Sequence, residues 1–118
     1  MTAVTGLSSP PVFCPVVADF YSGMEVTVPL FAKDIAASAA DIAKIYGELY
    51  DGEIVFFREN CDEDGFLSAA AYSGTDCMEI SVHGSDDRIL LVARYDNLGK
   101  GASGAAIECM NLALGLEA

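Results

Sequence analysis

The sequence predicts an α+β fold: a mostly antiparallel sheet with one packing helix, followed by a separate C-terminal helix. Apolar runs at residues 77–83 and 88–95 flank a Gly-Ser-Asp-Asp turn, which is typical of a β-hairpin. A β-branched run at 24–31 adds a strand, and helical apolar spacing over 38–50 adds the helix. One helix on a mainly antiparallel sheet makes two layers around one core, which suits a chain of 118 residues.

The first half of the chain is expected to contain two strands and the packing helix. Residues 1–11 have no pattern and are expected to be extended, whereas the short apolar run at 12–17 predicts a strand. Pro29 places the second strand at an edge of the sheet or at its own end, because proline cannot donate to a ladder. Ser38 and Asp41 have the spacing of a capping box and therefore mark the start of the helix.

The second half adds a buried strand, the hairpin and the terminal helix. Residues 53–58 predict the strand, and residues 59–65 an acidic loop. The terminal helix, at about 101–114, is apolar around nearly its whole circumference. Its thin polar stripe consists of Gly104, Glu108 and Asn111. A helix that is apolar on most sides is normally buried between layers, so we expect it to dock on a body absent from this chain.

Composition narrows the possible partners. The formal net charge is -12 with only 6 Lys and Arg, while 53% of the residues are hydrophobic and the mean hydropathy is +0.37. Much apolar surface is therefore expected to be hidden against partners, and scattered cations exclude nucleic acid. Without a leader pattern or an apolar run of about 18 residues, the chain is expected to be cytoplasmic. The four widely spaced cysteines predict reduced thiols, with neither a zinc site nor disulfides.

The turn between the last strand and the terminal helix is the candidate ligand site. Residues 94–104 run from the strand into an alanine-rich helix, where a Gly-rich turn is expected to present unpaired backbone N–H groups. This is the geometry of a phosphate or dinucleotide site. Gly99, Gly101 and Gly104 match G-x-G-x-x-G, although the strand and acidic residue that complete the fingerprint do not follow.

Three polar residues of this turn have alternative interpretations. Lys100 lies at a helix N-terminus, where a cation is disfavoured unless an anion is close, so we interpret it as an anion or cofactor contact rather than a solvated lysine. Asn97 either caps the helix or presents its amide to a ligand. Asp96, at the strand end, is interpreted as a turn former rather than an acid catalyst.

The rest of the chain offers weaker chemistry. The acidic loop, from Asn60 to Gly65, imitates the first half of a calcium loop, but Ala71 stands where a bidentate Glu is required. A solvated acidic loop is therefore the preferred interpretation. His83, beside the hairpin turn, is expected to be exposed, and no cysteine lies in a sequence context that activates a thiol. No metal site or catalytic motif is predicted.

The C-terminal part of the sequence resembles that of a known enzyme family. Residues 91–106, Leu-Val-Ala-Arg-Tyr-Asp-Asn-Leu-Gly-Lys-Gly-Ala-Ser-Gly-Ala-Ala, with Met-Asn-Leu-Ala-Leu-Gly at 110–115, closely resemble the C-terminal signature of type 2 N-acetyl-gamma-glutamyl-phosphate reductases. The likeness covers almost the whole chain and is weakest between 31 and 71. Further matching segments, in the family's order, are 5–7, 11–13, 23–24 with 26–30, 74–76 with 78–79, and 82–84.

The resemblance implies an NADPH-dependent reductase of arginine biosynthesis, which converts N-acetyl-glutamyl phosphate to N-acetylglutamate semialdehyde. In that family a cysteine in an Asn-Pro-Gly-Cys motif attacks the acyl phosphate, and a histidine in a His-x-x-Pro-Glu context handles protons. No residue of this chain has those neighbours, so neither role is transferred. The chain is therefore expected to be a C-terminal fragment that is inactive alone and forms homo-oligomers.

The same resemblance implies a division of labour along the chain. Residues 1–96 would form the substrate and oligomerisation domain, and 97–118 the turn and helix that belong to a missing NADP-binding domain. Within that turn the resemblance implies NADP contacts, near the nicotinamide, from Asn97, Gly99, Lys100 and Gly101. The alternative is a non-enzymatic α+β module that dimerises and binds a small anion at 99–104.

Overall fold

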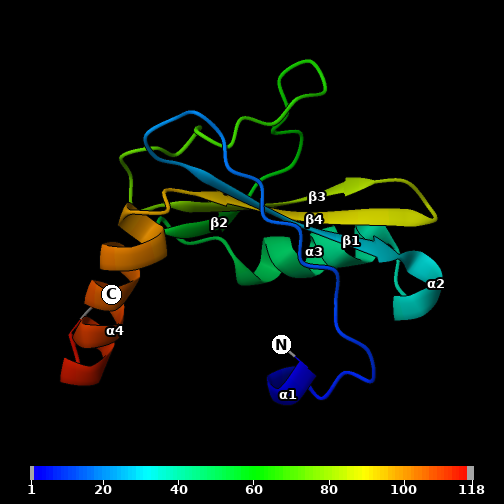
Figure 1. Ribbon diagram of the computed structural model, residues 1–118, viewed down its shortest axis with the longest axis horizontal. Coiled ribbons are helices and arrows are strands. Elements are labelled where there is room, and N and C mark those ends of the chain that lie inside the picture. Colours follow the sequence, from blue (N-terminus) through cyan, green and yellow to red (C-terminus); the bar gives the residue numbers. More distant parts are fainter. Residues whose placement is uncertain (1, 117–118) are drawn as a thin grey trace.

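The computed structural model describes residues 2–116 and has the expected α+β architecture (Figure 1). Its four-stranded sheet has the order β1-β4-β3-β2, antiparallel except for the parallel pair β2 and β3. The elements in chain order are α1 (Thr2–Thr5), β1 (Met24–Phe31), α2 (Ala32–Ile35), α3 (Ala39–Leu49), β2 (Val55–Phe57), β3 (Met78–Gly84), β4 (Arg88–Tyr95), the π-helical turn η1 (Gly99–Gly104) and α4 (Ala105–Leu114).

The predicted hairpin and packing helix are confirmed. Strands β3 and β4 pair in register from Met78 opposite Tyr95 to Gly84 opposite Ile89. Gly84 has a φ of +117°, and a Cβ there would lie 2.1 Å from the Arg88 carbonyl oxygen, so this turn requires glycine. Helix α3 begins at the predicted capping box, in which the Ser38 and Asp41 side chains each accept a hydrogen bond from the other's backbone N–H.

The register gives the sheet two different faces. One face carries Glu79 and Arg94, directly opposite each other on β3 and β4, beneath the long connection of residues 58–77. The other face carries apolar side chains and packs on α3, where the rings of Tyr46 and Phe57 lie 6.4 Å apart. Figure 1 shows α3 on one side of the sheet and the long connection on the other.

Three of the expected elements differ from the structure. Residues 12–17 form no strand and are exposed, because Pro11 and Pro15 cannot donate to a ladder. Thr2–Thr5 form a short helix instead of an extended lead-in. The predicted strand at 53–58 shortens to three half-buried residues, since β2 pairs with β3 alone and lies at the edge of the sheet.

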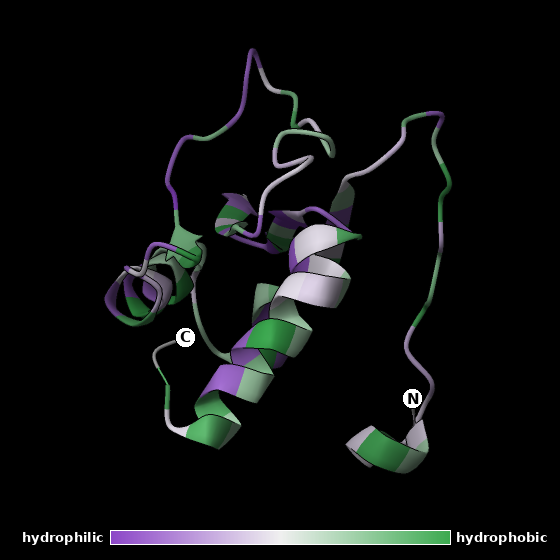
Figure 2. Cartoon of the chain, turned by 90° about the vertical axis from the view of Figure 1, so that its left-hand side faces the viewer, coloured by the Kyte–Doolittle hydropathy of each residue, from purple (hydrophilic) through white to green (hydrophobic). Residues whose placement is uncertain are grey.

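Helix α4 leaves the sheet instead of packing on it. Figure 1 shows α4 extending away from the end of β4. In Figure 2 the helix lies in the foreground and is well separated from the N-terminal segment. Its apolar side chains are exposed, for example Ile107 at 53% and Leu112 at 66%. Among the described residues, no helix is both long enough and apolar enough to cross a membrane.

Candidate functional site

Asp96 organises the turn that follows β4. Its side chain is only 2% exposed. One carboxylate oxygen accepts hydrogen bonds from the backbone N–H groups of Leu98, at 2.6 Å, and Gly99, at 2.8 Å. The other accepts from the Ser22 hydroxyl, at 2.8 Å, and from the Gly74 N–H. Three segments that are far apart in sequence therefore meet at one carboxylate, which extends the predicted turn-forming role.

These donors keep Asp96 ionised. The backbone N–H of Gly74, followed by that of Gly99 and the Ser22 hydroxyl, holds the pKa of Asp96 well below its usual range. Hydrogen bonds to a charged carboxylate favour its charged form, and this effect outweighs the opposing effect of burial. At neutral pH the turn consequently has a fixed negative charge at its centre, which disfavours a bound phosphate.

The turn does not offer the unpaired backbone amides that the glycine pattern suggested. The N–H groups of Leu98 and Gly99 bond to the Asp96 carboxylate. Gly101 donates its N–H to the Asp96 carbonyl, at 2.8 Å, and Ser103 donates to the Leu98 carbonyl, at 3.3 Å. The prediction of free amides is wrong for these four residues, because the Asp96 carboxylate caps the first two and the backbone hydrogen bonds of the π-type turn use the other two.

The two polar side chains of the predicted set hold the turn in place. Asn97 accepts a hydrogen bond from the Gly23 N–H, at 2.9 Å, and so ties the turn to the start of β1. Lys100 is 7% exposed, and its ammonium group pairs with both carboxylate oxygens of Glu108 on α4. A cation near a helix N-terminus is unfavourable because of the helix dipole. Here Glu108 supplies the compensating negative charge, so no external anion is needed.

The two glycines of the predicted set permit close packing within the chain. A Cβ at Gly99 would lie 2.5 Å from the Thr75 carbonyl oxygen, and one at Gly101 would lie 2.9 Å from the Tyr95 ring. The group that approaches Gly99 closely is thus the connection that precedes β3. Close approach was expected at these positions, but in this structure the approaching atoms belong to the protein.

An open hollow of about 490 Å³ lies beside the turn. Gly99 lines it, whereas Asn97, Lys100 and Gly101 are absent from its described lining. The lining carries hydroxyl groups and two carboxylates, of which Asp96 already accepts four hydrogen bonds, so the Asp76 carboxylate and the hydroxyl groups are the parts left to contact a ligand. The lining residues are Tyr21, Ser22, Ser73, Gly74, Thr75, Asp76, Asp96, Leu98, Gly99 and Ser103.

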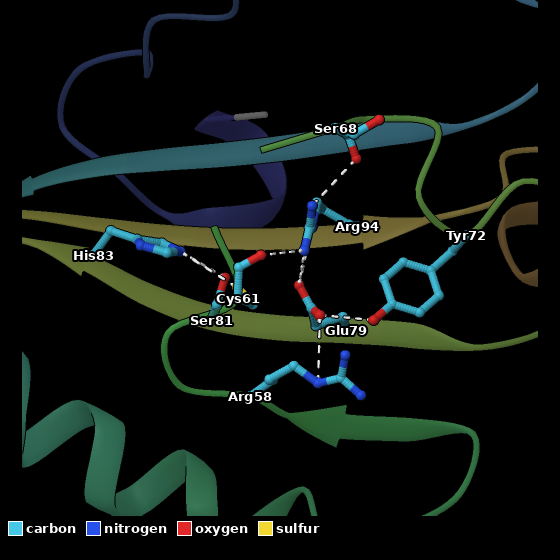
Figure 3. Close-up of polar contacts among 8 residues, drawn as sticks. All are labelled: Arg58, Cys61, Ser68, Tyr72, Glu79, Ser81, His83 and Arg94. Atoms are coloured by element: carbon cyan, nitrogen blue, oxygen red, sulfur yellow. Dashed lines mark hydrogen bonds and ion pairs between the residues drawn. The ribbon is translucent and has the colours of Figure 1, made fainter. Parts of the chain in front are cut away.

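A second polar cluster lies beneath the long connection (Figure 3). The Arg94 guanidinium donates to Glu79 from Nε, at 2.9 Å, and from a terminal nitrogen, at 2.6 Å. It also donates to the carbonyl oxygens of Cys61 and Ser68, both at 3.3 Å. Tyr72 donates its hydroxyl to Glu79, at 2.6 Å. Arg94 and Glu79 therefore fasten the connection to the sheet.

Electrostatics in this cluster favour the paired, charged state. Burial alone would raise the pKa of Glu79, but hydrogen bonds from Tyr72 and Arg94 outweigh it and leave that pKa lowered. Burial, followed by the Glu79 carboxylate, raises the pKa of Tyr72 to about 12. A neutral phenol and an ionised carboxylate are what a structural anchor requires at neutral pH.

The structure brings Cys61 and His83 together, which the sequence did not predict. The Cys61 sulfur lies 3.9 Å from His83 Nε2, which also lies 2.9 Å from the Ser81 hydroxyl. His83 is half-buried and not exposed as expected. Burial raises the pKa of the Cys61 thiol, so the pair lacks an activated nucleophile. The described residues contain no group of three or more His, Cys, Asp or Glu that could hold a metal ion.

Two cysteines also lie elsewhere than predicted. Cys14 is exposed in the irregular N-terminal segment, and Cys77 directly precedes β3 instead of forming part of it. The Glu79–Arg94 pair was not predicted from the sequence. A charged residue in each of two apolar, hairpin-paired strands was the available signal, since opposite charges on one face of a hairpin pair across strands.

Comparison with known proteins agrees with this fold. Residues 1–97 match the family model described as "Semialdehyde dehydrogenase, dimerisation domain". N-acetyl-gamma-glutamyl-phosphate reductase 2 of Nostoc sp. is 43% identical over 122 aligned residues, which cover 95% of this chain and 38% of that relative. The corresponding reductase of Trichormus variabilis is 42% identical over the same shares. That of Brucella ovis is 41% identical over 113 residues, which cover 89% of this chain and 36% of the relative.

The chain thus spans 36–38% of the length of these curated relatives. The family match covers every strand of the sheet and ends two residues before η1. The family match covers most of the chain, and the sequence identity to the relatives is high, so together they establish the family of this domain. The chain belongs to the semialdehyde dehydrogenase dimerisation-domain family.

Proposed function

We propose that this chain is the dimerisation and substrate-side part of an NADPH-dependent N-acetyl-gamma-glutamyl-phosphate reductase of arginine biosynthesis. The observation that carries the proposal is 41–43% identity to reductases of that name over 89–95% of the chain. In the proposed reaction a hydride from NADPH replaces phosphate at the acyl carbon. The products are the semialdehyde, NADP⁺ and inorganic phosphate.

Two parts of the chain have separate roles in this proposal. Residues 1–96 serve the substrate side and the subunit contacts, and residues 97–118 return to the NADP-binding domain of the whole enzyme. The exposed apolar side chains of α4 support this division, because a helix with such side chains needs a partner surface. The end of the family match at residue 97 is consistent with the same boundary.

For NADP, we propose that the turn containing Asn97, Gly99, Lys100 and Gly101 borders the nicotinamide end. The hollow beside Gly99 supports this end over the phosphates, because its hydroxyls and the Asp76 carboxylate suit a ligand that donates hydrogen bonds. A carboxamide and ribose hydroxyls are such donors. Asn97 holds the turn through Gly23, and Lys100 holds it through Glu108. Their proposed contribution to NADP affinity is therefore to position the turn.

The catalytic thiol and proton donor are proposed to lie in the remainder of the enzyme. Cys61 and His83 are adjacent, yet burial raises the thiol pKa, which is the reverse of what acyl-phosphate attack requires. The chain alone is therefore expected to be inactive. When bound, NADPH supplies the hydride, and the residues of this chain shape and orient the site.

Genetic complementation tests the proposal. The matching part of the Nostoc reductase is replaced by this chain, and the chimera is expressed in a bacterium that lacks its own reductase. Growth without arginine is expected from the chimera and not from the chain alone. The Nostoc reductase without replacement is the positive control. A folded chimera that fails to restore growth, or growth supported by this chain alone, contradicts the proposal.

A further inference from the structure

We propose that Ser73 is a specificity-determining residue of the hollow beside the turn, and that its hydroxyl oxygen accepts a hydrogen bond from an amide N–H of a bound reactant. Ser73 lines the hollow but lies outside the turn itself. The assignment rests on the reductase function proposed above. Two groups in that reaction offer an amide N–H: the carboxamide of the nicotinamide ring and the acetamido group of the acyl phosphate.

The direction of the hydrogen bonds at Ser73 follows from the number of hydroxyl protons. Ser22 donates its single hydroxyl proton to the Asp96 carboxylate, at 2.8 Å, because an ionised carboxylate can only accept. The hydroxyl oxygens of Ser22 and Ser73 lie 2.5 Å apart. Since the Ser22 proton is already donated, Ser73 is the donor of this second bond. The Ser73 oxygen therefore offers a ligand lone pairs and no proton.

The other serine and threonine hydroxyls of the lining are committed in the same way. Thr75 donates its hydroxyl to the Tyr72 carbonyl, at 2.8 Å. Ser103 donates its hydroxyl to the Leu98 carbonyl, at 3.1 Å. Tyr21 is 91% exposed, and its hydroxyl is the one in this lining that donates to no described residue. The protons of the serine and threonine side chains are thus used within the protein.

The backbone donors around the hollow are used as well. Six lining residues donate their N–H groups within the chain, three to the Asp96 carboxylate and three to backbone carbonyl oxygens. They are Gly74, Leu98 and Gly99 in the first group, and Ser73, Thr75 and Ser103 in the second. A ligand group that needs donors, such as a phosphate, finds few in this lining, whereas an N–H group finds acceptors.

Charge selects in the same direction. An oxygen of the Asp76 carboxylate would lie 3.1 Å from a Cβ at Gly99, so this carboxylate borders the turn. Asp96, which also lines the hollow, is ionised. Two negative charges disfavour the phosphate and carboxylate groups of the reactants, whereas an amide N–H is uncharged and its hydrogen is positively polarised. The amide is therefore the reactant group that suits this lining.

Ser73 is held in place without a ligand. Its backbone N–H bonds to the Ala70 carbonyl, at 3.1 Å, and the N–H of Gly74, the next residue, bonds to the Asp96 carboxylate. Its hydroxyl is anchored on Ser22, which is only 6% exposed. Ser73 itself is exposed and therefore accessible to a ligand. A contact fixed in this way loses little freedom on binding and can discriminate between similar ligands.

Isothermal titration calorimetry of the Nostoc chimera with Ser73→Ala tests this assignment. Each ligand is compared with an analogue in which carbon or oxygen replaces the amide nitrogen. The pairs are NADP⁺ with its acetylpyridine analogue, and N-acetyl-glutamate with acetoxyglutarate. Ser73→Ala is expected to weaken the N–H ligand of one pair about tenfold and its analogue by less than about twofold, because only the former loses a hydrogen bond. The pair that responds identifies the source of the N–H.

Two further variants separate this contact from a structural effect. Ser73→Thr keeps a hydroxyl group and should bind all four ligands within about twofold of the unaltered chimera. Ser85→Ala makes the same chemical change at an exposed serine that lies in the hairpin turn and outside the lining of the hollow. It should also leave the four affinities unchanged within about twofold.

The alternative results have defined meanings. Equal weakening of an N–H ligand and its analogue by Ser73→Ala would show a general disturbance of the site and would overturn the assignment. Unchanged affinities for all four ligands would overturn it too. If the unaltered chimera still restores growth without arginine, the reductase proposal remains in place in both cases. A folded chimera that restores no growth contradicts the reductase proposal, and the Ser73 assignment then fails with it.

Discussion

Asp96 illustrates how a single residue connects distant parts of this chain. Its identity as a turn former is predictable, because it follows a strand and precedes a Gly-rich stretch. Its partners Ser22 and Gly74 lie 74 and 22 residues away, and no local pattern identifies them. The same limitation explains the glycines: their spacing predicted close approach, while only the folded chain shows that Thr75 makes it.

Asp96→Asn should lower the melting temperature at neutral pH by on the order of 5 °C. An amide cannot accept all the hydrogen bonds that the carboxylate accepts. Because the folded-state pKa of Asp96 is lowered, its contribution to stability is present above the unfolded-state pKa of about 3.9 and is lost as pH falls further. The difference between variant and wild type in calorimetry should therefore shrink below about pH 4. A difference that stays constant down to acid unfolding would contradict this role.

Arg94→Met should destabilise the fold by about 3 kcal/mol or more, because it leaves the Glu79 carboxylate buried without its cation. Combining it with Glu79→Gln should recover part of this loss, since the unpaired charge is then removed. Urea unfolding of the two single variants and the double variant measures both effects. Additive losses would show that Arg94 and Glu79 do not act as a pair.

At the level of elements, the sequence predicts a helix start or a turn correctly where all the residues that define it lie close together in the chain. The capping box of α3 and the hairpin turn at Gly84 both formed as predicted. Residues 12–17 form no strand despite their apolar content, because Pro15 has no N–H to donate to a ladder. The start of α4 shifted because a π-type turn, stabilised by Asp96 and by Lys100 with Glu108, occupies its first predicted turn.

The same substitution should have opposite effects in two elements. Gly47→Ala lies in the interior of α3, where the new Cβ would meet the Phe57 ring at an ordinary 3.5 Å, so it should stabilise the chain by about 0.5–1 kcal/mol. Gly99→Ala would place a Cβ 2.5 Å from the Thr75 carbonyl oxygen, so it should destabilise the chain by about 1–3 kcal/mol. Chemical denaturation of both variants tests this. A neutral Gly99→Ala would mean that Thr75 does not pack on the turn as described.

At the level of the whole molecule, the exposed apolar surfaces indicate a domain that packs against more than one partner surface. Strand β1, α4 and the N-terminal segment all expose large apolar side chains, including Val26 at 41%, Leu112 at 66% and Val12 at 97%. High hydropathy in a strongly acidic chain predicted hidden apolar surface. Composition could not locate it, because the faces of a sheet are defined only by strand order and register.

The initial rate of NADPH oxidation by the purified Nostoc chimera, with N-acetyl-glutamyl phosphate as substrate, tests directly whether this chain belongs to such a reductase. We expect a rate within about tenfold of the Nostoc reductase, equivalent to about 1.4 kcal/mol in activation free energy, and no NADPH oxidation by this chain alone. A folded, dimeric chimera that does not oxidise NADPH when N-acetyl-glutamyl phosphate is supplied would contradict the assignment of this chain to the reductase.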